Sequence, residues 1–130
     1  MDKTPLMMDE IEAGKEFIRR LHAYRPVKAA CWMRETEDAG RYLLVALDGL
    51  KMENADQAYD EVLRITKEMK DHYIDPFDVK LVNPDDPAAV AILDHYRRYP
   101  GRVPPPFKGS VLGRLPVVEV YVYSPLAPML

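Results

Sequence analysis

The sequence has little of what several common protein classes require. A single cysteine among 130 residues cannot form an intrachain disulfide, which excludes a disulfide scaffold. The longest uncharged stretch, residues 120–130, is shorter than the ~20 apolar residues of a membrane-spanning helix. The first residues are acidic where a secretory signal is basic and then apolar. We therefore expect a protein of the reducing cytoplasm with no membrane partner.

Motifs for covalent or metal-dependent catalysis are missing as well. Only two serines are present, and neither belongs to a nucleophile elbow or a phosphate-binding loop. Cys31 lies in an apolar, strand-like run, which favours a buried thiol over a reactive one. Neither paired C-x-x-C nor H-E-x-x-H occurs. We therefore predict no catalytic residue, no metal ligand and no cofactor.

Two short patterns keep an enzymatic alternative open. His72, Asp75 and Asp78 have a spacing that could bind a metal ion through imidazole and carboxylate groups, although a polar loop explains it too. Asp78 and Lys80 form an acid-x-lysine pair on an expected strand, similar to part of the signature of restriction-endonuclease-like nucleases. The acids upstream of this pair fall on an expected helix instead of a strand. The alternative function is a metal-dependent phosphodiesterase, and the bland interpretation is charge alternation on a solvent-facing strand.

Composition and periodicity predict a single domain over residues 1–130, with an apolar tail at 124–130 that docks or frays. The patterns predict, in chain order, a helix over 7–24, strands over 27–35 and 41–48, a helix over 54–69, a strand over 77–82, a helix over 87–99 and a strand over 117–123. The proline-rich residues 102–116 are expected to form a loop, with room for a short strand near 110–112. We therefore expect an α+β fold, with a mixed sheet of four or five strands and about three helices packed mainly on one face.

Charge is distributed unevenly along the chain. Residues 95–118 contain five basic side chains and no acid, whereas the residues before them are acidic overall. Aromatic, proline and glycine residues are interleaved with these cations. Arginine and aromatic rings on a stiff loop suit the phosphates and bases of single-stranded nucleic acid, and the same cations suit an acidic protein. The predicted binding residues, within the loop 97–114, are Arg97, Arg98, Tyr99, Arg102, Phe107, Lys108 and Arg114.

These cations also have a structural explanation. Arg97 and Arg98 in the last turn of a helix complement the helix dipole, and Arg102 or Arg114 can pair with acids elsewhere in the domain. A third interpretation is a pairing module, either a subunit or immunity-type protein or a homodimer, that uses residues 117–123 as an edge strand. Our leading hypothesis is a non-catalytic binding domain that recognises nucleic acid or an acidic protein through the loop 97–114.

Residues 74–123 also resemble a set of small uncharacterised bacterial proteins. The resemblance rests on IDPFDVKLV followed by PDDP, on RRYPGRVP, and on the spaced pattern that ends in EVYVY. It implies a bacterial origin, and it implies neither a function nor a catalytic residue.

Overall fold

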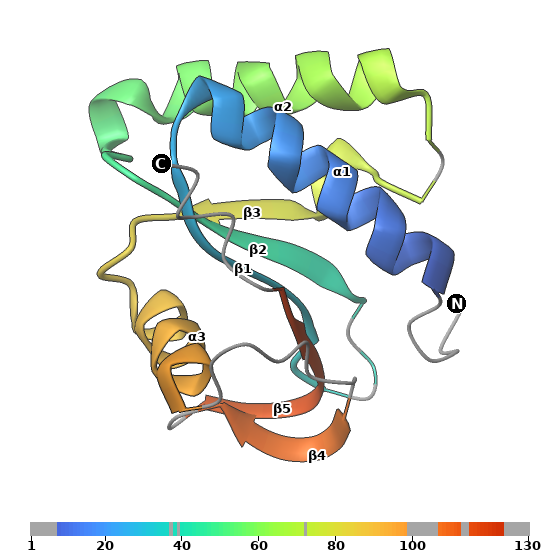
Figure 1. The fold of residues 1–130 in the computed structure, drawn as a ribbon, viewed down its shortest axis with the longest axis vertical. Coiled ribbons are helices and arrows are strands. Elements are labelled where there is room, and N and C mark those ends of the chain that lie inside the picture. Colours follow the sequence, from blue (N-terminus) through green and yellow to red (C-terminus); the bar gives the residue numbers. More distant parts are fainter. Residues whose placement is uncertain are drawn as a thin grey trace.

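The computed structural model describes residues 8–123 except 37, 39, 72, 99–106 and 113–114. Its elements are α1 (Met8–Tyr24), β1 (Val27–Arg34), β2 (Tyr42–Leu47), the 3-10 turn η1 (Met52–Asn54), α2 (Ala55–Met69), the 3-10 turn η2 (Pro76–Asp78), β3 (Val79–Val82), α3 (Pro87–Arg98), β4 (Phe107–Leu112) and β5 (Leu115–Val122). The strands form one mixed sheet in the order β3-β2-β1-β5-β4 (Figure 1). The predicted α+β class is confirmed. The tail 124–130 lies outside the described residues.

Strand directions follow from how the chain connects them. β1 and β2 are joined by a short loop and pair antiparallel, with Trp32 opposite Leu43. β2 and β3 are joined through α2 and pair parallel, with Val45 opposite Leu81. β5 pairs antiparallel with both β1 and β4. β2 therefore lies inside the sheet, as its uninterrupted apolar sequence predicts.

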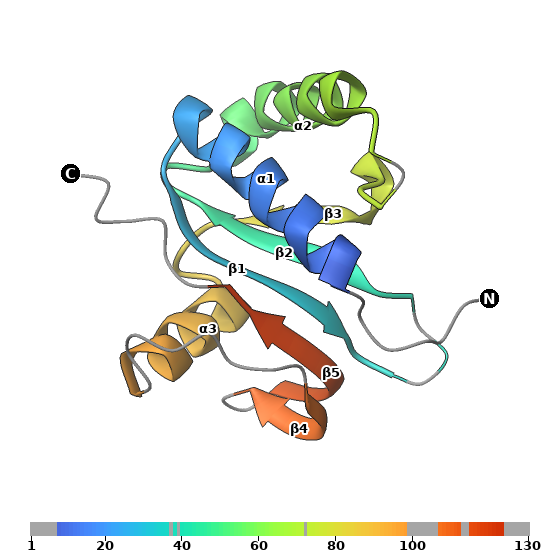
Figure 2. The same ribbon diagram turned by 45° about the vertical axis from the view of Figure 1, so that its right-hand side comes forward.

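The helices cover both faces of the sheet. α1 and α2 lie on one face and α3 on the other, which Figures 1 and 2 show from two sides. Alternate residues along β1 divide between the two cores: Trp32 belongs to the α1–α2 core, whereas Cys31 and Met33 belong to the α3 core. Each large side chain that is fully buried in this way contributes roughly 1.5–3 kcal/mol. In the described residues, no helix is long and apolar enough to cross a bilayer.

A buried polar contact fixes α1 against β1 and β5. The indole N–H of Trp32 donates to the hydroxyl of Tyr123 over 2.8 Å, and this hydroxyl donates to the carbonyl of Ile11 in α1 over 2.7 Å. Gly14 lies directly over the pair, because any Cβ at this position would overlap the Tyr123 hydroxyl. Burial raises the pKa of Tyr123. The hydroxyl therefore stays protonated and can act as donor and acceptor at once.

The C-terminal part of the fold corrects two predictions. The expected loop 102–116 contains a full strand, β4, and β5 begins at Leu115 instead of 117. β5 lies between β1 and β4, so the prediction that 117–123 is an edge strand is wrong. The physical reason is pairing: the six residues of β4 gain a hydrogen-bonded partner in β5, which overrides the weak strand propensity of a glycine-containing segment.

A further correction concerns the start of the strand expected at 77–82. Asp75 accepts a hydrogen bond from the backbone N–H of Phe77 over 2.9 Å, and Pro76 occupies the first position of the turn η2. Phe77, the first residue of the strand expected at 77–82, consequently lies in this turn and is 90% exposed. β3 begins only at Val79, which is buried together with Leu81 as the alternation predicts.

Candidate functional site

The predicted basic loop is in part a helix end and a strand. α3 begins as expected, with the carboxylate of Asp86 accepting from the backbone N–H of Ala88 over 2.9 Å and Pro87 at the first helical position. α3 packs on β1, β5 and β4, so it contacts the strand that residues 107–112 of the predicted basic loop form (Figure 2). The described residues on either side of 99–106 thus belong to two neighbouring elements, α3 and β4.

The structure places four of the seven predicted binding residues. Arg97 lies in the last turn of α3, is 77% exposed, and has a guanidinium nitrogen 3.8 Å from the carboxylate of Asp94. Arg98 ends α3, and Phe107 and Lys108 begin β4, where the backbone of Lys108 lies opposite Glu119. Nothing further is described for the side chains of these last three binding residues. The remaining predicted residues, which lie outside the described part of the chain, are Tyr99, Arg102 and Arg114.

The nuclease-like pattern does not have the geometry that its chemistry needs. Asp78 lies in η2 and not on β3, so it and Lys80 do not share a strand. The carboxylate of Asp75 caps η2, and His72 lies outside the described residues. Lys80 instead has its ammonium group 5.7 Å from the ring centroid of Tyr42, a cation–π contact. No group of three potential metal ligands is found among the described residues.

The surroundings of Asp78 fit a structural role for this residue. Partial burial raises the pKa of Asp78, and the neighbouring carboxylate of Asp75 raises it further. No third potential metal ligand from the described residues joins these two carboxylates. Cys31 is fully buried, which raises the pKa of its thiol and confirms the expectation of a buried cysteine.

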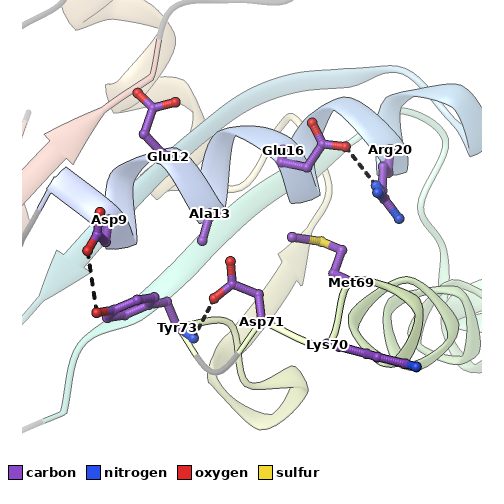
Figure 3. A pocket seen from close by; sticks show the side chains of 9 residues that line it. All are labelled: Asp9, Glu12, Ala13, Glu16, Arg20, Met69, Lys70, Asp71 and Tyr73. Carbon is purple, nitrogen blue, oxygen red and sulfur yellow. Dashed lines mark hydrogen bonds and ion pairs between the residues drawn. The ribbon is translucent and has the colours of Figure 1, made fainter.

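A groove that the sequence analysis missed lies between α1 and the C-terminal end of α2 (Figure 3). Its volume is about 550 Å³. Ala13 lines the groove on α1, and the residues after α2 line its other side. Lys70 follows α2 in the left-handed conformation, with φ 55°. The lining residues are Asp9, Glu12, Ala13, Glu16, Arg20, Met69, Lys70, Asp71 and Tyr73.

Most charges in this groove are already engaged. Arg19 and Arg20 donate to the carboxylate of Glu16, over 2.6 and 2.7 Å, and these hydrogen bonds lower the pKa of Glu16 to about 2. The carboxylate of Asp71 accepts from the backbone N–H of Tyr73 over 2.9 Å. The helix spacing of the acids at 9, 12 and 16 could have indicated one wall of the groove, but the other wall depends on where α2 ends in space.

Comparison with known proteins adds no assignment. No protein-family model matches the chain, and neither the curated proteins nor the solved structures contain a significant match. The function is therefore argued from the residues and their geometry.

Proposed function

We propose that the protein is a non-catalytic binding domain that recognises an anionic partner through its basic segment, residues 97–114. The observation that carries this proposal is the separation of charge: the chain from 95 to 118 has five basic side chains and no acid, within a protein of net charge −3. A locally positive surface on an acidic protein attracts polyanions to one place only.

The described geometry supports the availability of Arg97 to a partner. Arg97 is largely exposed, and its contact with Asp94 spans 3.8 Å between two solvent-accessible groups. Such ion pairs contribute only about 0–1 kcal/mol, so a phosphate or a partner's carboxylate can replace Asp94 at little cost. α3 contacts β4, so the cations at 97, 98 and 108 belong to neighbouring elements.

Nucleic acid and an acidic protein both supply the required charge. The buried single thiol of Cys31 fits a reducing cytoplasm, which we propose as the location of the protein. A metal-dependent phosphodiesterase is not proposed, because Asp78 and Lys80 occupy different elements.

The test replaces Arg97, Arg98 and Arg102 together by glutamine. Binding of single-stranded RNA, duplex DNA and polyglutamate is measured at low and at physiological salt. We expect the wild type to bind at least one polyanion with affinity that falls as salt rises, and the triple variant to lose this binding while keeping its fold.

The matched control replaces three exposed cations of the rest of the domain, Lys15, Lys51 and Lys67, by glutamine. It changes net charge equally and should retain binding. The proposal is wrong if no polyanion binds at low salt, or if both triple variants lose affinity to the same extent.

A further inference from the structure

The two edge strands of the sheet, β3 and β4, differ in how far other described residues cover them. β3 forms one edge, and the hydroxyl of Tyr59, on α2, accepts the backbone N–H of Leu81 over 2.9 Å. An outward-facing donor of this edge is thereby satisfied, and the ring of Tyr59 stands beside it. β3 is also only four residues long. Short strands and covered donors are ways in which proteins prevent an edge from pairing with another chain.

β4 forms the other edge and lacks this protection in the part of the chain that is described. It has six residues, and its ladder joins it to β5 on one side only. No described segment pairs with its outer side. A strand in this position offers backbone N–H and C=O groups on its outer side for pairing with an extended chain.

The elements at this edge contain basic residues. α3, which carries Arg97 and Arg98 in its last turn, packs on β4, and Lys108 is part of β4 itself. The sequence places no acid between residues 95 and 118. β5 places Glu119 opposite Lys108, so a chain that pairs with β4 would meet a region in which the five basic residues of 95–118 outnumber this one acid.

We infer that β4 binds an acidic segment of a partner protein in extended conformation, as a sixth strand of the sheet. This inference rests on the proposed function and names the partner's class. Backbone hydrogen bonds would set the register between the partner's chain and β4. The partner's carboxylates would pair with the basic residues of α3 and β4. Nucleic acid has no backbone ladder to pair with β4, so the open edge favours a protein partner.

The experiment uses the whole protein and a labelled peptide that alternates glutamate with threonine. Its control is the same peptide with every backbone nitrogen methylated, which keeps the charge and removes the donors. We expect the unmethylated peptide to bind and the methylated one to bind at least about tenfold more weakly, since several hydrogen bonds are lost. A single-stranded thymidine oligonucleotide is the nucleic-acid probe.

The outcomes separate the two proposals. If both peptides bind equally, or if only the oligonucleotide binds, the added-strand inference is wrong while the proposed function stands. If no probe binds, both fail. The decisive readout in the protein is backbone hydrogen exchange: the peptide should protect amides of β4 and leave those of β3 unchanged. A dimer whose β4 amides are already protected without peptide would show that a second copy occupies the edge, and would overturn the inference.

Discussion

The layer formed by α1 and α2 differs from the end formed by α3 and β4 in how its charges are used. In α1 and α2 cations and acids alternate on the same helices, and Arg64, for example, pairs with both Glu61 and Glu68. Arg41 similarly pairs with Glu10 over 3.2 Å, in a partly buried position. At the other end the cations of 95–118 have no acid within their own segment. Charge in the first region is therefore paired within the fold, whereas we propose that charge in the second binds a partner.

The sheet edges repeat this difference. The edge under α2 is closed by Tyr59, and the edge beside α3 is open in the described residues. Under the proposed function, a partner would associate with the side of the open edge and the basic residues, and not with the side of α1 and α2. Substitutions in α1 and α2 test whether this layer is as rigidly assembled as its contacts indicate.

The largest effect is expected from Gly14→Ala. The added methyl group would overlap the Tyr123 hydroxyl and lie 2.8 Å from the indole nitrogen of Trp32, so α1 must shift and the buried hydrogen bonds weaken. We expect a loss of about 2–3 kcal/mol in the free energy of unfolding, measured by urea denaturation. Gly40→Ala is the control, because a Cβ there meets nothing within 4 Å.

This variant also sharpens the comparison between the two regions. The folded fraction of Gly14→Ala should bind polyanions as the wild type does, since Gly14 lies on the face opposite α3. Equal stability of the Gly14 and Gly40 variants would show that α1 does not depend on the contact with Tyr123.

A smaller effect is expected from Tyr59→Phe, which opens the closed edge. The backbone N–H of Leu81 loses its acceptor, so we expect a destabilisation of about 1 kcal/mol and faster hydrogen exchange at the Leu81 amide. Tyr24→Phe is the control, because Tyr24 is exposed to a similar extent and its hydroxyl makes no hydrogen bond to the described residues. Unchanged exchange at Leu81 would mean that the hydroxyl does not close this edge.

Local signals were sufficient for most elements of the fold. Asp86 followed by Pro87 determines the start of α3 through groups adjacent in the chain, and the apolar spacing of α1 determines its buried side. Phe77 was misplaced although the signal was also local: an aspartate before a proline forms a capped turn, which competes with the alternation typical of a strand.

Strand order and the groove could not be predicted in this way. Whether β5 is an edge strand depends on β4, whose sequence has low strand propensity and which is stabilised by its partner. The groove needs the end of α2 to lie beside α1, a contact between residues far apart in the chain. Of the predicted binding residues, Arg97 is exposed as a binding role requires, and the role itself stays a prediction.

The smallest effect on the free energy of unfolding is expected from Glu16→Gln in α1, and it depends on pH. Hydrogen bonds from Arg19, and then from Arg20, lower the pKa of Glu16 from its ordinary value of 4.5 to about 2. A carboxylate with a lowered pKa in the folded state stabilises the protein above its unfolded pKa, and this contribution is lost as pH falls through the folded value. Because the three side chains are solvent-accessible, Glu16→Gln should cost only about 0.3–1 kcal/mol at neutral pH.

This difference should shrink below pH 4.5 and disappear near pH 2. The direct measurement is an NMR titration of the Glu16 carboxyl carbon, with Arg19→Gln and Arg20→Gln as variants that should each raise its midpoint. A wild-type midpoint near 4.5 would mean that Glu16 is not held by these arginines. The acidic layer would then carry unneutralised charge of its own, and the contrast with the basic segment would rest on the sign of the charge alone.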